Sequence, residues 1–221
     1  MIITKQKSLE DIKKAIGDVR SVFLVGCGDC ATLCHTGGDE DLREMTKILN
    51  AEGIEVTGQA TVPATCHELD TKRILRKEKE AVEKAEGILV MACGAGIQAV
   101  GDNSEKLTVS GCDSLFIGNS RRQMHFYEKC SACGNCVLNM TGGICPETRC
   151  PKALLNGPCG GAVNGKCEVD HEQNCVWIEI YERLVKVGRL DLMGEIIRPK
   201  DFRASGKPRR LIEPRNASGK R

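Results

Sequence analysis

The chain has 221 residues, enough for one large domain or for two small ones with apolar cores. Its formal net charge is only +2 and aromatic residues make up 3%, which argues against a nucleic-acid-binding surface. No apolar run approaches the roughly 20 residues of a membrane span and the N-terminus lacks the apolar stretch of a secretory signal, so we expect a cytoplasmic protein.

Helical and strand patterns alternate over residues 1–125. Ser8 opens a capping box for a first helix that ends near Gly17, and residues 42–49 form the apolar stripe of a second helix. The charged stretch 68–87 is expected to be a single surface helix. Four apolar runs are expected to be strands: residues 21–26, 54–62, 87–93 and 114–119. The alternation predicts an α/β domain with a small, mostly parallel, Rossmann-like sheet.

The pattern changes over residues 126–176, where eight cysteines occur among many glycines and prolines. This segment has little apolar periodicity, so we expect an irregular, cysteine-rich domain stapled by metal. Residues 177–221 form the third part, a helix predicted over 176–193 and a tail. From Lys186 onward the chain carries 11 Lys or Arg against 4 Asp or Glu, and we expect the helix and the basic tail to dock a partner.

The 14 cysteines of a cytoplasmic chain indicate metal or thiol chemistry rather than disulfides. In an open parallel sheet, ligands collect beyond the carboxyl ends of the strands. Five cysteines fall at that edge: Cys27, Cys30, Cys34, Cys66 and Cys93. A [4Fe-4S] cluster needs four thiolates, so one of the five is spare, and the sequence leaves open which one. Cys112 is expected to be a packed thiol.

The loop GCGDCATLCHTGG, residues 26–38, allows other interpretations. Residues 26–31 and 94–99 both fit the dinucleotide fingerprint G-x-G-x-x-A, although each has a cysteine inside or directly before it. Cys27 and Cys30 have the spacing of a thioredoxin-type redox pair, and Cys30 alone could be a catalytic thiol. We favour a metal cluster because the other interpretations leave most of the cysteines unexplained.

The strongest motif is Cys130-x2-Cys133-x2-Cys136, a spacing with which bacterial ferredoxins wrap one cubane cluster. Five further cysteines follow: Cys145, Cys150, Cys159, Cys167 and Cys175. Eight thiolates suffice for two four-thiolate sites. The spacing allows two [4Fe-4S] clusters, or one cluster with one tetrahedral Zn²⁺, and it leaves the pairing among the eight open.

These motifs resemble a known family. Five segments carry the resemblance: GCGDCATLCHTGG, YEKCSACGNC, GGICP, RCPKALLNGPCGG and GKCE. The chain is similar to the small, MetV-type iron–sulfur subunit of bacterial methylenetetrahydrofolate reductase. The C-terminal part of that subunit also occurs as the methylenetetrahydrofolate reductase C-terminal domain. The resemblance covers most of the chain and is weakest in the basic tail. It implies an electron-transfer subunit with two or three [4Fe-4S] clusters, in some members with zinc, and without a catalytic residue of its own.

The resemblance also implies partners. One is a MetF-type subunit that carries flavin and reduces methylenetetrahydrofolate to methyltetrahydrofolate; the other is ferredoxin or another low-potential electron donor protein. Flavin is expected only in the partner, since this chain is too short for a (β/α)8 barrel of about 250 residues. The rival hypothesis is a zinc-stabilised scaffolding subunit of the same complex that transfers no electrons.

Overall fold

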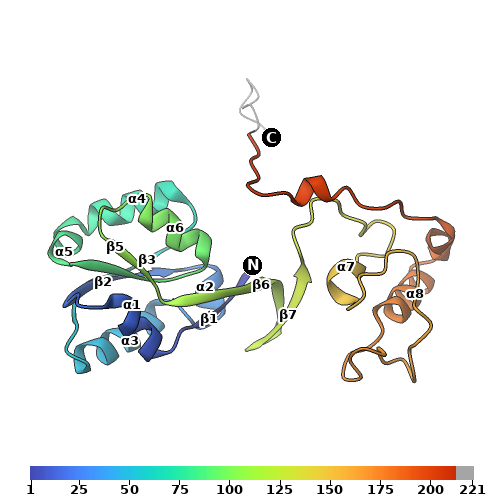
Figure 1. Cartoon of the computed structure of the whole chain (residues 1–221), viewed down its shortest axis with the longest axis horizontal. Helices are drawn as coiled ribbons and strands as arrows, with labels where there is room; N and C mark the ends of the chain where they lie inside the picture. The colour runs from blue at the N-terminus through green and yellow to red at the C-terminus, as the bar shows by residue number, and fades with distance from the viewer. Residues whose placement is uncertain (213–221) are drawn as a thin grey trace. The chain divides into compact units, whose positions relative to one another are not determined.

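The structure is a computed structural model that describes residues 1–212, so the last part of the predicted tail lies outside the described residues. The chain divides into two compact units, Met1–Glu128 and a second that begins at Lys129. The elements that begin in the first unit are β1 (Ile2–Gln6), α1 (Leu9–Ile16), β2 (Ser21–Cys27), α2 (Cys30–Leu33), α3 (Asp39–Ala51), β3 (Glu55–Val62), α4 (Glu68–Lys77), α5 (Lys79–Lys84), β4 (Gly87–Met91), α6 (Gly94–Gly101), β5 (Leu107–Ser110), β6 (Cys112–Arg122) and β7 (His125–Cys130) (Figure 1).

A four-stranded parallel sheet in the order β3-β2-β4-β5 forms the centre of the first unit. Strand β2 is buried along its whole length, because helices cover both faces of the sheet. Val22 and Leu24 of this strand pack with α1 and α3 on one face, whereas Phe23 and Val25 pack on the other face with α4 and α6. Figure 1 shows the same two helical layers. The predicted α/β fold with a parallel sheet is therefore confirmed.

A second sheet was not predicted. It is antiparallel, in the order β1-β6-β7, and Ile2 of β1 pairs with Ile117 of β6. The apolar run 114–119 is a strand, as expected, but it lies in this sheet. The fourth parallel strand is instead β5, which has only four residues and is too short to give a clear apolar alternation.

Local boundaries follow the sequence in some places and depart from it in others. The Ser8 side chain caps α1 by accepting a hydrogen bond from the Asp11 backbone N–H at 3.1 Å, as predicted. The predicted single helix over 68–87 is two helices, α4 and α5, because Glu78 between them has a ψ of 22°, far from the helical value.

The second unit contains few regular elements within the described residues: α7 (Pro146–Arg149), α8 (Val176–Lys186) and the 3-10 helices η1 (Leu190–Gly194) and η2 (Phe202–Ser205). Helix α8 ends earlier than predicted. The Gly188 N–H donates to Val185 O and the Arg189 N–H donates to Leu184 O, and Gly188 has a φ of 68°, which together form a Schellman end.

Apolar burial differs sharply between the units. The first holds two core clusters of eleven buried residues each, whereas the described part of the second holds one cluster of five, centred on α8. The hydrophobic effect therefore contributes far less to the second unit. None of the helices among residues 1–212 is long and apolar enough to cross a lipid bilayer.

Candidate functional site

Three cysteines occupy the carboxyl edge of the parallel sheet. Cys27 is the last residue of β2, Cys66 follows β3, and Cys93 follows β4 as the N-cap of α6. Because β3, β2 and β4 are neighbours and run parallel, their ends bring these residues to one edge. Burial raises the pKa of the Cys66 thiol, and the charges of Cys93 and Cys27 raise it further, as expected for neighbouring sulfurs.

Cys30 lies beside this group, at the start of α2. Its sulfur accepts a hydrogen bond from the Ile2 backbone N–H at 3.4 Å. Burial is the main cause of the raised pKa of Cys30, with further contributions from the charges of Asp29 and Cys27. We name Cys27, Cys30, Cys66 and Cys93 the sheet-edge thiols.

Cys27 is the member of this group that is best suited to be a thiolate. Burial alone would raise its pKa, but hydrogen bonds from the Thr65 backbone and side chain and from the Asp29 and Ala31 backbones lower the pKa below its ordinary value. Several N–H and O–H donors around one sulfur are also the environment of a metal-bound thiolate.

Cys34, the fifth cysteine predicted at this edge, has different surroundings. It is 2% exposed and its sulfur lies 3.9 Å from the Ile2 carbonyl oxygen, to which the thiol donates. Cys112 is a neighbour of Cys34 and belongs to the apolar core. Cys34 thus lies next to the apolar core, and the sulfurs of Cys30 and Cys34 both hydrogen-bond to Ile2.

The loop over residues 26–38 passes tightly against the strand ends. The Cys27 N–H donates to Gly37 O at 2.9 Å and the Gly28 N–H donates to Val62 O at 2.8 Å. A dinucleotide site needs free backbone N–H groups at this position to bind a pyrophosphate. Here these groups have partners within the protein, so the glycines serve close packing and the dinucleotide interpretation loses support.

In the second unit, four cysteines line one pocket between α7, α8 and the loops that join them: Cys150, Cys159, Cys167 and Cys175. Cys150 and Cys175 cap α7 and α8, and the other two come from the irregular segment between these helices. We name this set the pocket thiols. The sequence left the pairing among eight cysteines open, and the structure groups these four.

The rest of the pocket wall is mainly apolar, with a few charged side chains. Trp177 lies against it, 5% exposed, with its indole N–H donating to Leu154 O at 3.0 Å. Arg149 and Lys152 also line the pocket and form ion pairs with Glu179 and Glu168. Glu168 also lines the pocket, so the two cations are balanced by carboxylates and the thiols face a mainly apolar wall.

The remaining cysteines of the second unit are Cys130, Cys133, Cys136 and Cys145. The loop through the first three curls tightly, with Ala132 at φ 52° and Gly134 at φ 79°. The Ala132 N–H donates to the Cys130 sulfur at 3.2 Å, and the Lys200 ammonium donates to the Cys133 sulfur at 3.0 Å. The hydrogen bond from Lys200 is the main reason why the pKa of Cys133 is lowered.

Two sets of four thiols have the number of donors that a [4Fe-4S] cluster needs. All 14 cysteines are free thiols, and two sets of four share one sheet edge and one pocket. Within residues 1–212, however, no three His, Cys, Asp or Glu side chains are arranged to hold a single metal ion. The chemistry of both sets fits a four-thiolate group, and N–H donors to sulfur accompany such groups.

Sequence reasoning missed Lys200, because this residue lies 67 positions from Cys133 and belongs to no cysteine motif. The only available signal was a lysine in a basic tail, which by itself indicates a solvated surface.

No curated protein and no solved structure matches the chain. A family model does match part of it. Residues 109–203, which include all the cysteines of the second unit and Lys200, match the family described as methylene-tetrahydrofolate reductase C terminal, and this match supports a relationship of the segment to that reductase.

Proposed function

We propose that the chain is an electron-transfer subunit of a methylenetetrahydrofolate reductase complex and holds [4Fe-4S] clusters on its cysteines. The observation that carries the proposal is the set of four thiols around one pocket, within the segment related to this reductase. When bound, such clusters accept and pass on single electrons. Fourteen cysteines suit a reducing compartment, so we place the complex in the cytoplasm.

The chain's own residues supply the ligands and their surroundings. The sheet-edge thiols are the proposed ligands in the first unit. In the second unit they are the pocket thiols and the set Cys130, Cys133, Cys136 and Cys145. Hydrogen bonds from Thr65 to Cys27 and from Ala132 to Cys130 would stabilise thiolate charge. Within residues 1–212 neither unit offers a folate or flavin site that we recognise.

The partners in the proposal follow from the sequence resemblance and from the family match. Electrons would enter from ferredoxin or another low-potential donor and leave to the flavin of a MetF-type catalytic subunit. Two exposed apolar side chains, Leu33 (57% exposed) and Leu69 (70% exposed), lie within three residues of Cys30 and Cys66. Exposed apolar residues next to a redox centre favour a short contact with a partner protein.

The test is the metal content of the full chain purified without oxygen. Three clusters predict about 12 iron atoms with equal sulfide per chain, and two clusters with one zinc predict about eight. Brown protein that dithionite bleaches supports the proposal. Colourless protein that contains only zinc would overturn it in favour of the scaffolding role.

Cys30→Ser and Cys34→Ser form a matched pair for the same measurement. Cys30 belongs to the sheet-edge thiols, whereas Cys34 is 2% exposed, donates to the Ile2 carbonyl and is the cysteine that we propose as the spare one of the five. We expect C30S to lose about four irons per chain and C34S to keep the wild-type content. Unchanged iron in C30S together with lost activity would instead indicate a catalytic thiol.

A further inference from the structure

Lys200 is an unusual residue for a basic tail, because its side chain is only 2% exposed. Its ammonium nitrogen lies 3.0 Å from the Cys133 sulfur and 3.3 Å from a carboxylate oxygen of Glu147. Lysine is almost never fully buried unless it is paired. Paired with a carboxylate and a sulfur, the ammonium group keeps the positive charge that lysine ordinarily carries at neutral pH.

The tail is anchored to the rest of its unit on both sides of Lys200. On one side the Asn156 side chain pairs with the Ile197 backbone, accepting from its N–H at 2.7 Å and donating to its carbonyl at 2.9 Å. On the other side Arg209 donates to the Ala132 carbonyl. These contacts fix the backbone on either side of Lys200, so the ammonium group is positioned at Cys133 by the fold.

Close packing of the tail against the cysteine loop supports the same placement. Gly134 has a φ of 79°, and a Cβ built there would lie 2.9 Å from Ala204 of the tail. The absence of a side chain at residue 134 thus allows the tail to approach the loop. Cys133, which is partly buried, is then in contact with a segment of its own chain that carries a fixed cation.

A fixed cation changes the energetics of electron uptake at a thiolate-bound group. Reduction adds one electron, and hence one negative charge, while no covalent bond forms or breaks and Lys200 stays protonated. A positive charge about 3 Å from a ligand sulfur stabilises the reduced state more than the oxidised state. Glu147 is a negative charge at the same site and acts in the opposite direction.

We propose that Lys200 is a positioning residue that raises the reduction potential of the cluster bound through Cys133, and that Glu147 moderates its effect. This inference rests on the proposed function, since it requires a cluster at this loop. It assigns to the tail a role within its own unit, in addition to any contact with a partner.

The experiment is a potentiometric titration of the full chain, reduced stepwise with dithionite and followed by electron paramagnetic resonance. The variants are Lys200→Met, Glu147→Gln and Arg198→Met, the last a matched control because Arg198 is an exposed cation of the same tail segment. We expect K200M to lower the reduced-to-oxidised ratio of one cluster about tenfold at a given potential, which corresponds to 59 mV for one electron. E147Q is expected to shift the same cluster in the opposite direction, and R198M to shift none.

Iron and sulfide are counted in every sample, so that the two proposals can fail separately. Wild-type protein without iron overturns both. If the wild-type protein contains iron but the cluster potentials of K200M and E147Q equal those of R198M, only the role of Lys200 is overturned. If K200M loses its cluster, E147Q decides: a shift to higher potential supports the inference, and an unchanged potential overturns it. A purely structural Lys200 would not produce shifts of opposite sign.

Discussion

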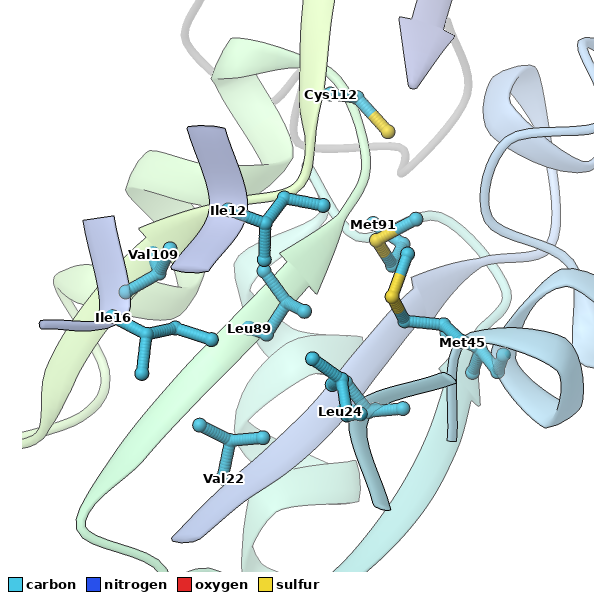
Figure 2. Close-up of a cluster of buried hydrophobic side chains, with 11 residues drawn as sticks. Ile12, Ile16, Val22, Leu24, Met45, Leu89, Met91, Val109 and Cys112 are labelled. Atoms are coloured by element: carbon cyan, nitrogen blue, oxygen red, sulfur yellow. The ribbon is translucent and has the colours of Figure 1, made fainter. Parts of the chain in front are cut away.

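Cys112 differs from the other thiols because it lies inside an apolar core. It is 2% exposed and packs in the cluster that includes Ile12, Met91 and Val109 (Figure 2). Its sulfur donates to Thr36 O at 3.4 Å. Burial raises the pKa of Cys112 to about 12 from the ordinary 9.0. The residue is thus the packed thiol that the sequence suggested, and its neutral form is the one that the fold accommodates.

This burial predicts an alkaline loss of stability. Below pH 9 the thiol is neutral in the folded and the unfolded state, whereas above pH 9 it ionises only in the unfolded state. The free energy of unfolding therefore falls by about 1.4 kcal/mol per pH unit between pH 9 and the folded pKa. When the pH is raised from 8 to 10, the free energy of unfolding of Cys112→Ala should fall by about 1.4 kcal/mol less than that of the wild type.

The measurement is urea unfolding of both proteins at the two pH values, with reductant present and circular dichroism as the probe. The other thiols titrate equally in both proteins, so their contribution cancels in the difference. An equal loss in the wild type and in C112A would contradict the burial of a neutral thiol.

At the scale of single elements, the loop between β2 and α3 depends on two glycines that pass close to other backbone. A Cβ on Gly37 would overlap the Met91 carbonyl at the end of β4, and one on Gly26 would overlap the Gly37 carbonyl. The close approach holds the loop against the strand ends, where Cys27 and Cys93 lie. The loop conformation and the grouping of the sheet-edge thiols are therefore coupled.

Gly37→Ala is expected to destabilise the first unit by about 1–3 kcal/mol, because a backbone atom of β4 would have to move. Gly94→Ala is the matched control, since a Cβ there meets only the Ser114 side chain, at 3.6 Å. Thermal unfolding followed by circular dichroism measures both. We expect G94A to change stability by no more than about 0.5 kcal/mol, and equal losses in the two variants would contradict the close packing at Gly37.

At the scale of the whole molecule, the two units differ in what stabilises them. The first has two extensive apolar clusters, whereas the described part of the second has one cluster of five residues and eight cysteines. A unit with so little apolar burial needs another source of stability, and metal–thiolate bonds are the candidate that its composition offers. Metal removal is therefore expected to affect the units unequally.

Trp177, the only tryptophan of the chain, allows the second unit to be followed alone. It is 5% exposed and lines the pocket of the pocket thiols. Treatment with an iron and zinc chelator should shift its fluorescence to longer wavelength, while circular dichroism retains the helices and strands of the first unit. Fluorescence that stays unchanged after complete metal loss would show that the second unit folds without metal.

Local features of this chain could be predicted from its sequence. The cap at Ser8, the buried strand β2 and the three cysteines spaced by two residues depend on neighbours within a few positions. Helix and strand periods are local properties of the same kind. The sequence by itself therefore determined the α/β class of the first unit, the presence of Cys27 and Cys93 at its strand ends and the change of pattern near residue 126.

Only the tertiary structure decided which distant residues meet. The pairing of β1 with β6, the hydrogen bond of Cys34 to Ile2 and the contact of Lys200 with Cys133 all join segments far apart in the chain. Such contacts depend on strand order and on how each loop closes, which spacing and periodicity do not encode. For the same reason the sequence did not show that the pocket thiols form one group. They line one pocket in the structure because of the way in which the chain between α7 and α8 folds.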